Sequence, residues 1–266
     1  VVIVVLSLLL AMIAGIATAM VGQQRREGTR QKLAGGETAI SLFVSQNRRL
    51  PCPADGTLAG TDVNAGKESP DPYTGTCTGN QANGVVPWRA LGLGEQDITD
   101  GWGNRMTYRA TLHFVGVDSL NFTSCDPGAA ILGGVPVASC NGACTTTTFP
   151  ASCTHPADIT RTRGLTVQNL AGAVVMNPQT AASTTPSTGA AYVVISHGEN
   201  GSGAFNNLGI LQAASGTDWG TEEAKNAANL ALGAYYVDDF PVYADGAGHF
   251  DDFVLRPSIL TVATKA

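Results

Sequence analysis

With 266 residues, of which 44% are apolar and 14% charged, the chain can bury a core in one or two domains, which excludes a disordered protein. A formal charge of −6 excludes the broad basic surface that binds phosphate groups, so no nucleic acid partner is evident. Neither a Walker lysine motif nor a haem-attachment motif occurs, so we expect no cofactor.

The chain begins with an apolar run that predicts a long helix. Its first 22 residues contain no charged side chain, whereas the next ten contain five. At ~1.5 Å per residue, such a helix measures roughly 33 Å, enough to cross the hydrocarbon core of a bilayer. Three interpretations are open: a secretory signal peptide, for which Ala17-Thr18-Ala19 fits the cleavage pattern, a simple membrane anchor, and a helix that also drives assembly.

Small residues within this run favour the assembly interpretation, because they let neighbouring helices approach closely. They are Ala11, Ala14, Gly15, Ala17 and Ala19. The residues that we expect to line the assembly helix are Val1, Leu6, Leu10, Ala14, Gly15 and Ala17.

The helix is expected to continue beyond the apolar run with one apolar face. This face consists of Leu33, Ile40, Phe43 and Val44, which recur at helical spacing. Gly28, Gly35 and Gly36 should weaken the helix locally, and Pro51 should end it. The resulting domain division is a helix over residues 1–50 and a globular head over residues 51–266.

After Leu50, short β-prone runs alternate with turns rich in Gly, Asn and Asp, which predicts an antiparallel sheet. The runs cover residues 105–117, 164–176, 191–196 and 253–263. The expected fold class is α+β, in which the long N-terminal helix packs on an antiparallel sheet with long disulfide-bearing loops. Residues 145–148 and 177–190 are expected to be exposed loops rich in Ser and Thr.

Six cysteines lie beyond the helix, and their even number indicates an oxidising compartment and up to three disulfides. They are Cys52, Cys77, Cys125, Cys140, Cys144 and Cys153. A bond between Cys52 and Cys77 is the best single guess, because it would close the first loop after the helix. A zinc site at Cys140, Cys144, Cys153 and His155 is the alternative, which the lack of a short Cys-x2-Cys spacing disfavours.

Two turn segments carry polar residues that a search for catalytic sites would notice. In the segment 100–104, the glycines and asparagine predict a tight turn in which Asp100 accepts backbone N–H groups and Trp102 covers the sheet edge. In the segment 196–201, Ser196, His197 and Glu199 are neighbours on one strand or turn and so point in different directions. We therefore expect structural turns and no enzyme.

Five aspartates near the C-terminus are weak calcium candidates, since calcium prefers clustered oxygen ligands. They are Asp238, Asp239, Asp245, Asp251 and Asp252. Their spacing does not match an EF-hand, so solvated turn carboxylates are the preferred interpretation and no metal is expected. The histidines are spread along the chain and form no convincing ligand pair.

Taken in order, these segments resemble bacterial type IV pilins and the pseudopilins of type II secretion. The resemblance rests on VVIVVLSLLLAMIA at the start, RLPCPADG (49–56), GVVPWRALGLGEQD (84–97), DGWGNRMTYRA (100–110), SHGENGSGAF (196–205), EEAKN (222–226) and FDDFV (250–254). The turn residues that it marks in the head are Asp100, Trp102, Gly103, Asn104, His197, Asn200, Asp251 and Asp252. Family members also begin with a glutamate-bearing segment, so the resemblance implies a short segment upstream of Val1.

The resemblance implies a structural subunit of a filament that polymerises through its N-terminal helix. Before assembly the helix would lie in the inner-membrane lipid, where a prepilin peptidase and an assembly platform would act on it. Afterwards the head would lie outside the cytoplasm, in an extracellular filament or a periplasmic pseudopilus. A minor pilin or pseudopilin is the alternative within the family, and a membrane-anchored extracellular binding module is the alternative outside it. Adhesion, motility, DNA uptake and protein secretion are not distinguished by the sequence.

Overall fold

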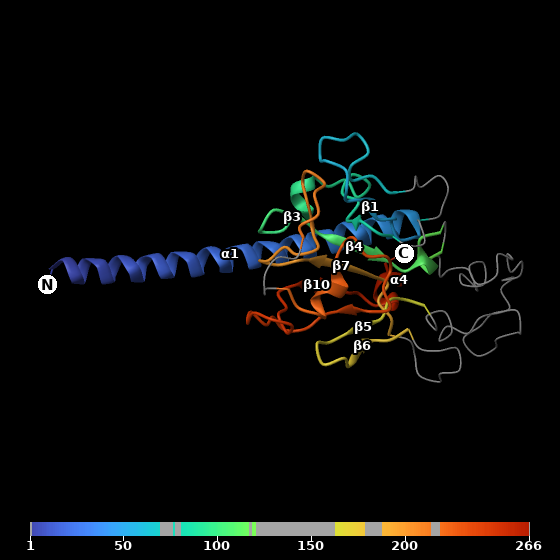
Figure 1. The fold of residues 1–266 in the computed structure, drawn as a ribbon. Coiled ribbons are helices and arrows are strands. Elements are labelled where there is room, and N and C mark those ends of the chain that lie inside the picture. Colours follow the sequence, from blue (N-terminus) through green and yellow to red (C-terminus); the bar gives the residue numbers. More distant parts are fainter. Residues whose placement is uncertain are drawn as a thin grey trace, which may run out of the picture.

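In the computed structural model, one long helix leads into a head built on an antiparallel sheet (Figure 1). The structure describes residues 2–69, 77, 81–116, 119–120, 163–178, 188–213 and 219–265. The helix, α1 (Val2–Asn47), has 46 residues and is therefore about 69 Å long at ~1.5 Å per residue. Its C-terminal half lies against the head, whereas its N-terminal half projects away from it (Figure 1).

No helix among the described residues is both long enough and apolar enough to cross a membrane.

The C-terminal half of α1 packs on the head through the apolar face that the sequence predicts. Leu33, Ile40, Phe43 and Val44 are all buried. The helix runs without interruption through its glycines, because packing of this face outweighs the roughly 1 kcal/mol that each glycine costs. The prediction that Pro51 ends the helix is wrong: α1 ends at Asn47, and Arg48 adopts a left-handed conformation with φ of 51° that turns the chain away.

Five antiparallel strands form the main sheet in the order β1–β2–β4–β7–β10. Their bounds are β1 (Ala54–Asp55), β2 (Gly84–Val85), β4 (Thr107–Ala110), β7 (Tyr192–Ser196) and β10 (Phe253–Leu255). The α+β class with an antiparallel sheet is thus confirmed. The central pair places Thr107 opposite Ile195 and Ala110 opposite Tyr192.

The main sheet is covered on both faces, which explains why every residue of β7 is buried. Because side chains alternate along a strand, Tyr192 and Val194 join the core that contains the apolar face of α1. Val193 and Ile195 join a second core with Val167, Met176 and Tyr236. This second core belongs to a small sheet in the order β6–β5–β9, formed by β5 (Val167–Gln168), β6 (Val174–Met176) and β9 (Tyr236–Val237).

Three of the four predicted β-prone runs are more broken than expected. Residues 105–117 contain part of β3 (Asn104–Arg105), which pairs with β8 (Phe205–Asn206), then β4, and then a 3-10 turn, η3 (Leu112–Phe114). Residues 164–176 form β5 and β6, and β5 pairs with β9 in parallel. Residues 253–263 end in a helix, α4 (Ile259–Ala263), because Pro257 ends the strand and the Ser258 hydroxyl accepts from the Thr261 N–H.

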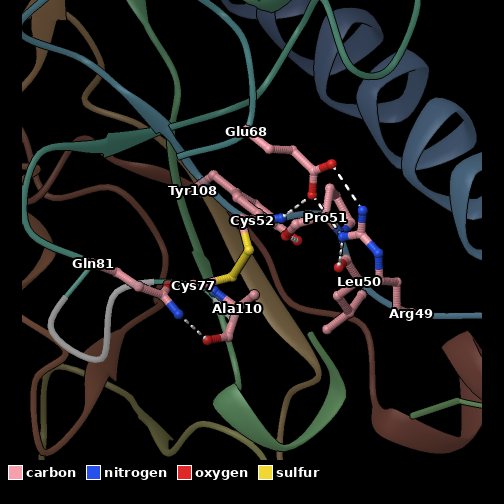
Figure 2. Close-up of a disulfide and its surroundings, with 9 residues drawn as sticks. All are labelled: Arg49, Leu50, Pro51, Cys52, Glu68, Cys77, Gln81, Tyr108 and Ala110. Carbon is pink, nitrogen blue, oxygen red and sulfur yellow. Dashed lines mark hydrogen bonds and ion pairs between the residues drawn. A yellow bond between two sulfur atoms is a disulfide. The ribbon is translucent and has the colours of Figure 1, made fainter. Parts of the chain in front are cut away.

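A disulfide between Cys52 and Cys77 closes the first loop after α1, as predicted (Figure 2). Beside it, both guanidinium nitrogens of Arg49 donate to the Glu68 carboxylate at 2.7 and 2.9 Å. Glu68 also accepts from the Cys52 N–H at 2.6 Å, so the charge pair fixes the chain where it leaves the helix. Cys125, Cys140, Cys144, Cys153 and the alternative ligand His155 lie outside the described residues, as do the loop at 145–148 and most of 177–190.

Candidate functional sites on the helix and in the head

The N-terminal half of α1 exposes apolar side chains all around the helix. The large ones that are more than half exposed are Ile3, Leu6, Leu10, Met12, Ile13, Ile16 and Met20. Ala14, Gly15 and Ala17 are exposed as well, whereas Val1 lies outside the described residues. We call residues 3–21 the apolar segment. A helix that is apolar on every side is normally buried among other helices or in lipid.

Gly15 has no role in the packing of the described chain. A Cβ added there would meet no atom within 4 Å, although glycine in a helix costs about 1 kcal/mol relative to alanine. Gly15 lies four residues after Ala11 and four before Ala19, so the three share one side of the helix. This side offers a surface on which a second helix backbone can approach closely.

The helix α1 contacts the head at the turn formed by residues 100–104. The Gly101 N–H donates to the Thr29 hydroxyl at 2.9 Å, and Lys32 Nζ donates to the Thr99 carbonyl at 2.6 Å. Gly101 has no room for a side chain, because an added Cβ would lie 2.5 Å from the Arg25 carbonyl. The helix and this turn therefore meet backbone to backbone.

Within the same turn, the predicted roles of Asp100 and Trp102 are found. Asp100 Oδ1 accepts from the backbone N–H of Trp102 at 3.0 Å and of Asn104 at 2.9 Å. Gly103 has φ of 92°, which glycine adopts without strain. The Trp102 ring stacks on Phe253 at the first residue of β10, with ring centroids 6.2 Å apart.

Turn residues that are far apart in the sequence converge on one buried polar cluster at the ends of β4, β7 and β10. Asp100 Oδ2 accepts from the Ser196 hydroxyl at 2.8 Å. His197 Nε2 lies 2.7 Å from the Thr107 hydroxyl, and His197 Nδ1 lies 3.8 Å from Asp252 Oδ1. Ser196 is thus bonded to an aspartate, and His197 to a threonine, rather than to each other as a nucleophile and its base would be.

Burial sets the protonation of this cluster. It lowers the pKa of His197 to about 3, with a smaller contribution from the Arg109 charge, so the ring is neutral. It raises the pKa of Asp252 well above its usual value, helped by the charge of Glu223, and it also raises the pKa of Asp100. The cluster therefore favours uncharged side chains and acts as a structural core rather than as a charged site.

A second group of polar side chains, which we call the Glu223 triad, consists of Glu223, His249 and Asp251. One potential ligand atom from each lies within 4.8 Å of the others. Glu223 belongs to a 3-10 turn, η4 (Glu223–Asn226), and Asp251 precedes β10. Burial, together with the neighbouring Glu223, raises the pKa of Asp251 to about 7.

Backbone groups of the 196–201 turn hold the Asp251 carboxylate in place. Asp251 Oδ2 accepts from the N–H groups of Glu199 at 2.6 Å and Asn200 at 3.0 Å. The turn can close this tightly because Gly198 has φ of 56° and a Cβ there would lie 2.3 Å from the Asp251 carbonyl. Asn200, which the sequence singled out, also donates from Nδ2 to both oxygens of Glu223.

Two members of the Glu223 triad, His249 and Asp251, line a cavity of about 360 Å³ between the head and α1. The cavity is lined by Arg26, Glu199, Asn200, Tyr243, His249 and Asp251. Arg26 is already engaged there, because its guanidinium lies 3.4 Å from Glu199 and 4.6 Å from the centre of the Tyr243 ring. The positive charge nearest the triad is therefore largely neutralised by a neighbouring carboxylate.

The five predicted acidic candidates do not form one site. Asp238 pairs with Arg256, Asp239 accepts from the Leu170 N–H at 3.0 Å, and only Asp245 is an exposed carboxylate. Asp251 and Asp252 are buried, so the interpretation as solvated turn carboxylates is wrong for both. Their apolar neighbours Phe250 and Phe253 draw this segment into the head, and backbone and amide donors replace water.

Sequence reasoning missed Glu223 and His249. Both lie in or beside segments that the resemblance marks, 222–226 and 250–254, which was the available signal. We compared the chain with protein-family models, curated proteins and solved structures, and none of them matches it.

Proposed function

We propose that this chain is a structural subunit of a type IV pilus-like filament and that it polymerises through the apolar segment of α1. The observation that carries the proposal is the exposure of that segment on every side, up to 83% for Ile3. Burying a side chain such as leucine or isoleucine gains about 1.5–3 kcal/mol, so several helices packed together gain a large contact energy.

Copies of the same helix are the occupants that best fit this surface. The side that carries Ala11, Gly15 and Ala19 lets one helix approach closely, while Leu10, Ile13 and Ile16 supply contact area. We infer that this contact joins different surfaces of successive copies and does not close into a ring, which generates a fibre.

The disulfide supports a head that lies outside the cytoplasm, since such bonds persist in oxidising compartments. An extracellular filament and a periplasmic pseudopilus both satisfy this condition. Residence of the helix in inner-membrane lipid before assembly, and the action of a peptidase and an assembly platform, remain predictions.

Charge insertion in the apolar segment tests the proposal. We expect Leu10→Glu to abolish filaments in the fraction sheared from cells that produce the chain, because a buried carboxylate would lack a partner. Leu260→Glu is the matched control, since Leu260 is an exposed leucine in α4 of the head. Electron microscopy and immunoblotting of sheared and cell fractions provide the measurement.

The outcomes separate the proposal from its alternatives. Filaments of the unaltered chain whose repeating density fits this head support a major subunit. Filaments that contain the chain only at one end indicate a minor subunit instead. If the chain persists in the membrane fraction and never enters filaments, the filament proposal is wrong and a tethered binding module is favoured.

A further inference from the structure

Three potential metal ligands meet in the Glu223 triad, and all three are deeply buried. Glu223, His249 and Asp251 have exposed fractions of 2%, 6% and 2%, and their ligand atoms lie within 4.8 Å of one another. Burying two carboxylates side by side is costly unless a positive charge or a proton compensates them. Of the five aspartates that the sequence had suggested, Asp251 alone belongs to this grouping.

Unpartnered atoms point into this group. Within the part of the chain that the structure describes, neither ring nitrogen of His249 has a hydrogen-bond partner, and neither does Asp251 Oδ1. His249 Nε2 lies 3.9 Å from Asp251 Oδ2, too far for a hydrogen bond. Buried polar atoms are nearly always bonded, so an imidazole with two free nitrogens beside a free carboxylate oxygen indicates that something else binds there.

We propose that Glu223, His249 and Asp251 bind one divalent transition metal ion, with zinc as the representative species. An imidazole nitrogen and carboxylate oxygens are common zinc ligands, whereas calcium and magnesium are bound almost entirely by oxygen. Zinc holds such ligands at about 2.0–2.2 Å in tetrahedral geometry, which places ligand atoms roughly 3.4 Å from each other. The ligand atoms of the triad lie within 4.8 Å of one another, so they would draw together when the ion binds.

Hydrogen bonds around the triad hold the two carboxylates in place. In metal sites, groups that are hydrogen-bonded to the ligands orient them in this way. Glu223 accepts from the Gly220 N–H at 3.0 Å and from Asn200 Nδ2, and Asp251 accepts from two backbone N–H groups. Asp251 Oδ1 accepts no hydrogen bond from the described residues and keeps its lone pairs for the ion. Glu223 also accepts from the Asp251 N–H, so its oxygens are fully bonded and it would exchange one of these contacts for the ion.

The cavity beside α1 gives the ion a path to the triad. Because Glu199 offsets the charge of Arg26, the carboxylate of Glu223 and that of Asp251, when ionised, leave a negative balance that attracts a cation. A bound ion would link η4 to the segment before β10, and through Asn200 it would hold the turn that faces α1. It would thus stiffen the head where it contacts α1.

Metal binding to the full chain tests the inference. The protein is purified in detergent, freed of metal with a chelator, and titrated with zinc while the metal-free fold is checked by circular dichroism. His249→Gln removes one ligand and no hydrogen bond made by the ring, so this variant should fold normally. We expect it to bind zinc at least about tenfold more weakly than the unaltered chain, which binds one ion at this site. Asp245→Asn, which removes an exposed carboxylate in the same region, should bind zinc as the unaltered chain does.

X-ray absorption at the zinc edge separates the triad from the cysteines. A first shell of nitrogen and oxygen at about 2.0–2.1 Å supports the triad, whereas sulfur at about 2.3 Å places the ion on thiolates and overturns the proposal. Equal zinc affinity in the unaltered chain and His249→Gln also overturns it. Tighter binding of calcium than of zinc would do the same, because it would leave the imidazole without a role.

Discussion

The two halves of α1 belong to one continuous helix, yet they make different contacts. In the C-terminal half, apolar residues lie on one face that packs into the head, and Thr29 and Lys32 bond to the turn beside it. In the N-terminal half, the apolar side chains that the structure describes are exposed on every side, and this half projects away from the head (Figure 1). The first pattern is that of a helix whose partner is within the same chain, and the second is that of a helix whose partners are elsewhere.

Truncating one apolar residue in each half is the strongest way to test this difference. We expect Ile40→Ala, at a fully buried position, to lower the free energy of unfolding by about 2–5 kcal/mol because it leaves a cavity. Leu10→Ala, at a position that is 60% exposed, should change it by less than about 0.5 kcal/mol. Urea unfolding of the full chain in detergent measures both, and equal effects would show that the two halves are packed alike.

Acid should change the stability of the head without acting on the apolar segment, which has no titratable side chain. Because burial lowers the pKa of His197 to about 3, the unfolded chain takes up a proton below pH 6.5 that the folded chain does not. The contribution of His197 to the free energy of unfolding should therefore fall with falling pH between about 6.5 and 3, by up to about 1.4 kcal/mol per pH unit. Charged and polar groups that face the ring are Asp252, Thr107 and Arg109.

His197→Gln isolates this effect, because Asp100, Asp251 and Asp252, whose raised pKa values act in the opposite direction, are present in both proteins. The free energy of unfolding of the unaltered chain, minus that of the variant, should decrease as the pH is lowered from 6 to 4. A difference that stays constant over this pH range would show that His197 takes up a proton in the folded head.

A smaller effect on stability is expected where α1 contacts the turn at residues 100–104. Thr29→Val keeps the shape of the side chain but removes the oxygen that accepts from the Gly101 N–H, which should cost about 1 kcal/mol. Thr38→Val is the control, since the exposed Thr38 hydroxyl bonds only within the helix, to the Ala34 carbonyl. Hydrogen exchange at the Gly101 amide should accelerate in the first variant alone, and unchanged exchange would contradict the role of Thr29.

The smallest change in stability is expected at Gly15. Gly15→Ala meets no atom within 4 Å and should stabilise the helix by up to about 1 kcal/mol, seen as unchanged or higher helicity in circular dichroism. Gly15→Leu should keep the helicity but lower the yield of filaments, because its bulk separates neighbouring helices. Normal filament yield from Gly15→Leu would show that close approach at this position is not needed.

Local patterns in the sequence were enough to predict α1, its buried face and the Cys52–Cys77 bond. The face depends on helical periodicity, and the disulfide depends on cysteines that flank one loop. By contrast, Glu223 and Asp251 lie 28 residues apart and meet only because η4 and the segment before β10 converge in the folded head. Such meetings are set by long-range packing, which no local pattern records.

One local signal and one long-range effect explain the errors at the C-terminus. Ile259–Ala263 is β-prone in composition, but a proline and a serine cap at Ser258 decide for a helix. Asp251 and Asp252 look like solvated turn residues until donors such as the Glu199 N–H and Asn226 Nδ2 are placed against them. Single-residue preferences were outweighed by a neighbouring cap at the first place and by contacts with distant parts of the chain at the second.

The Cys52–Cys77 disulfide also determines how a pulling force would travel through the molecule. Cys52 lies between α1 and β1, a two-residue strand held at the edge of the sheet by its pairing with β2. Tension on the chain that leaves α1 therefore reaches the covalent bond before β1, and the bond carries the load directly from Cys52 to Cys77. The edge strand lies inside the closed loop and is shielded from this load, and the loop cannot lengthen.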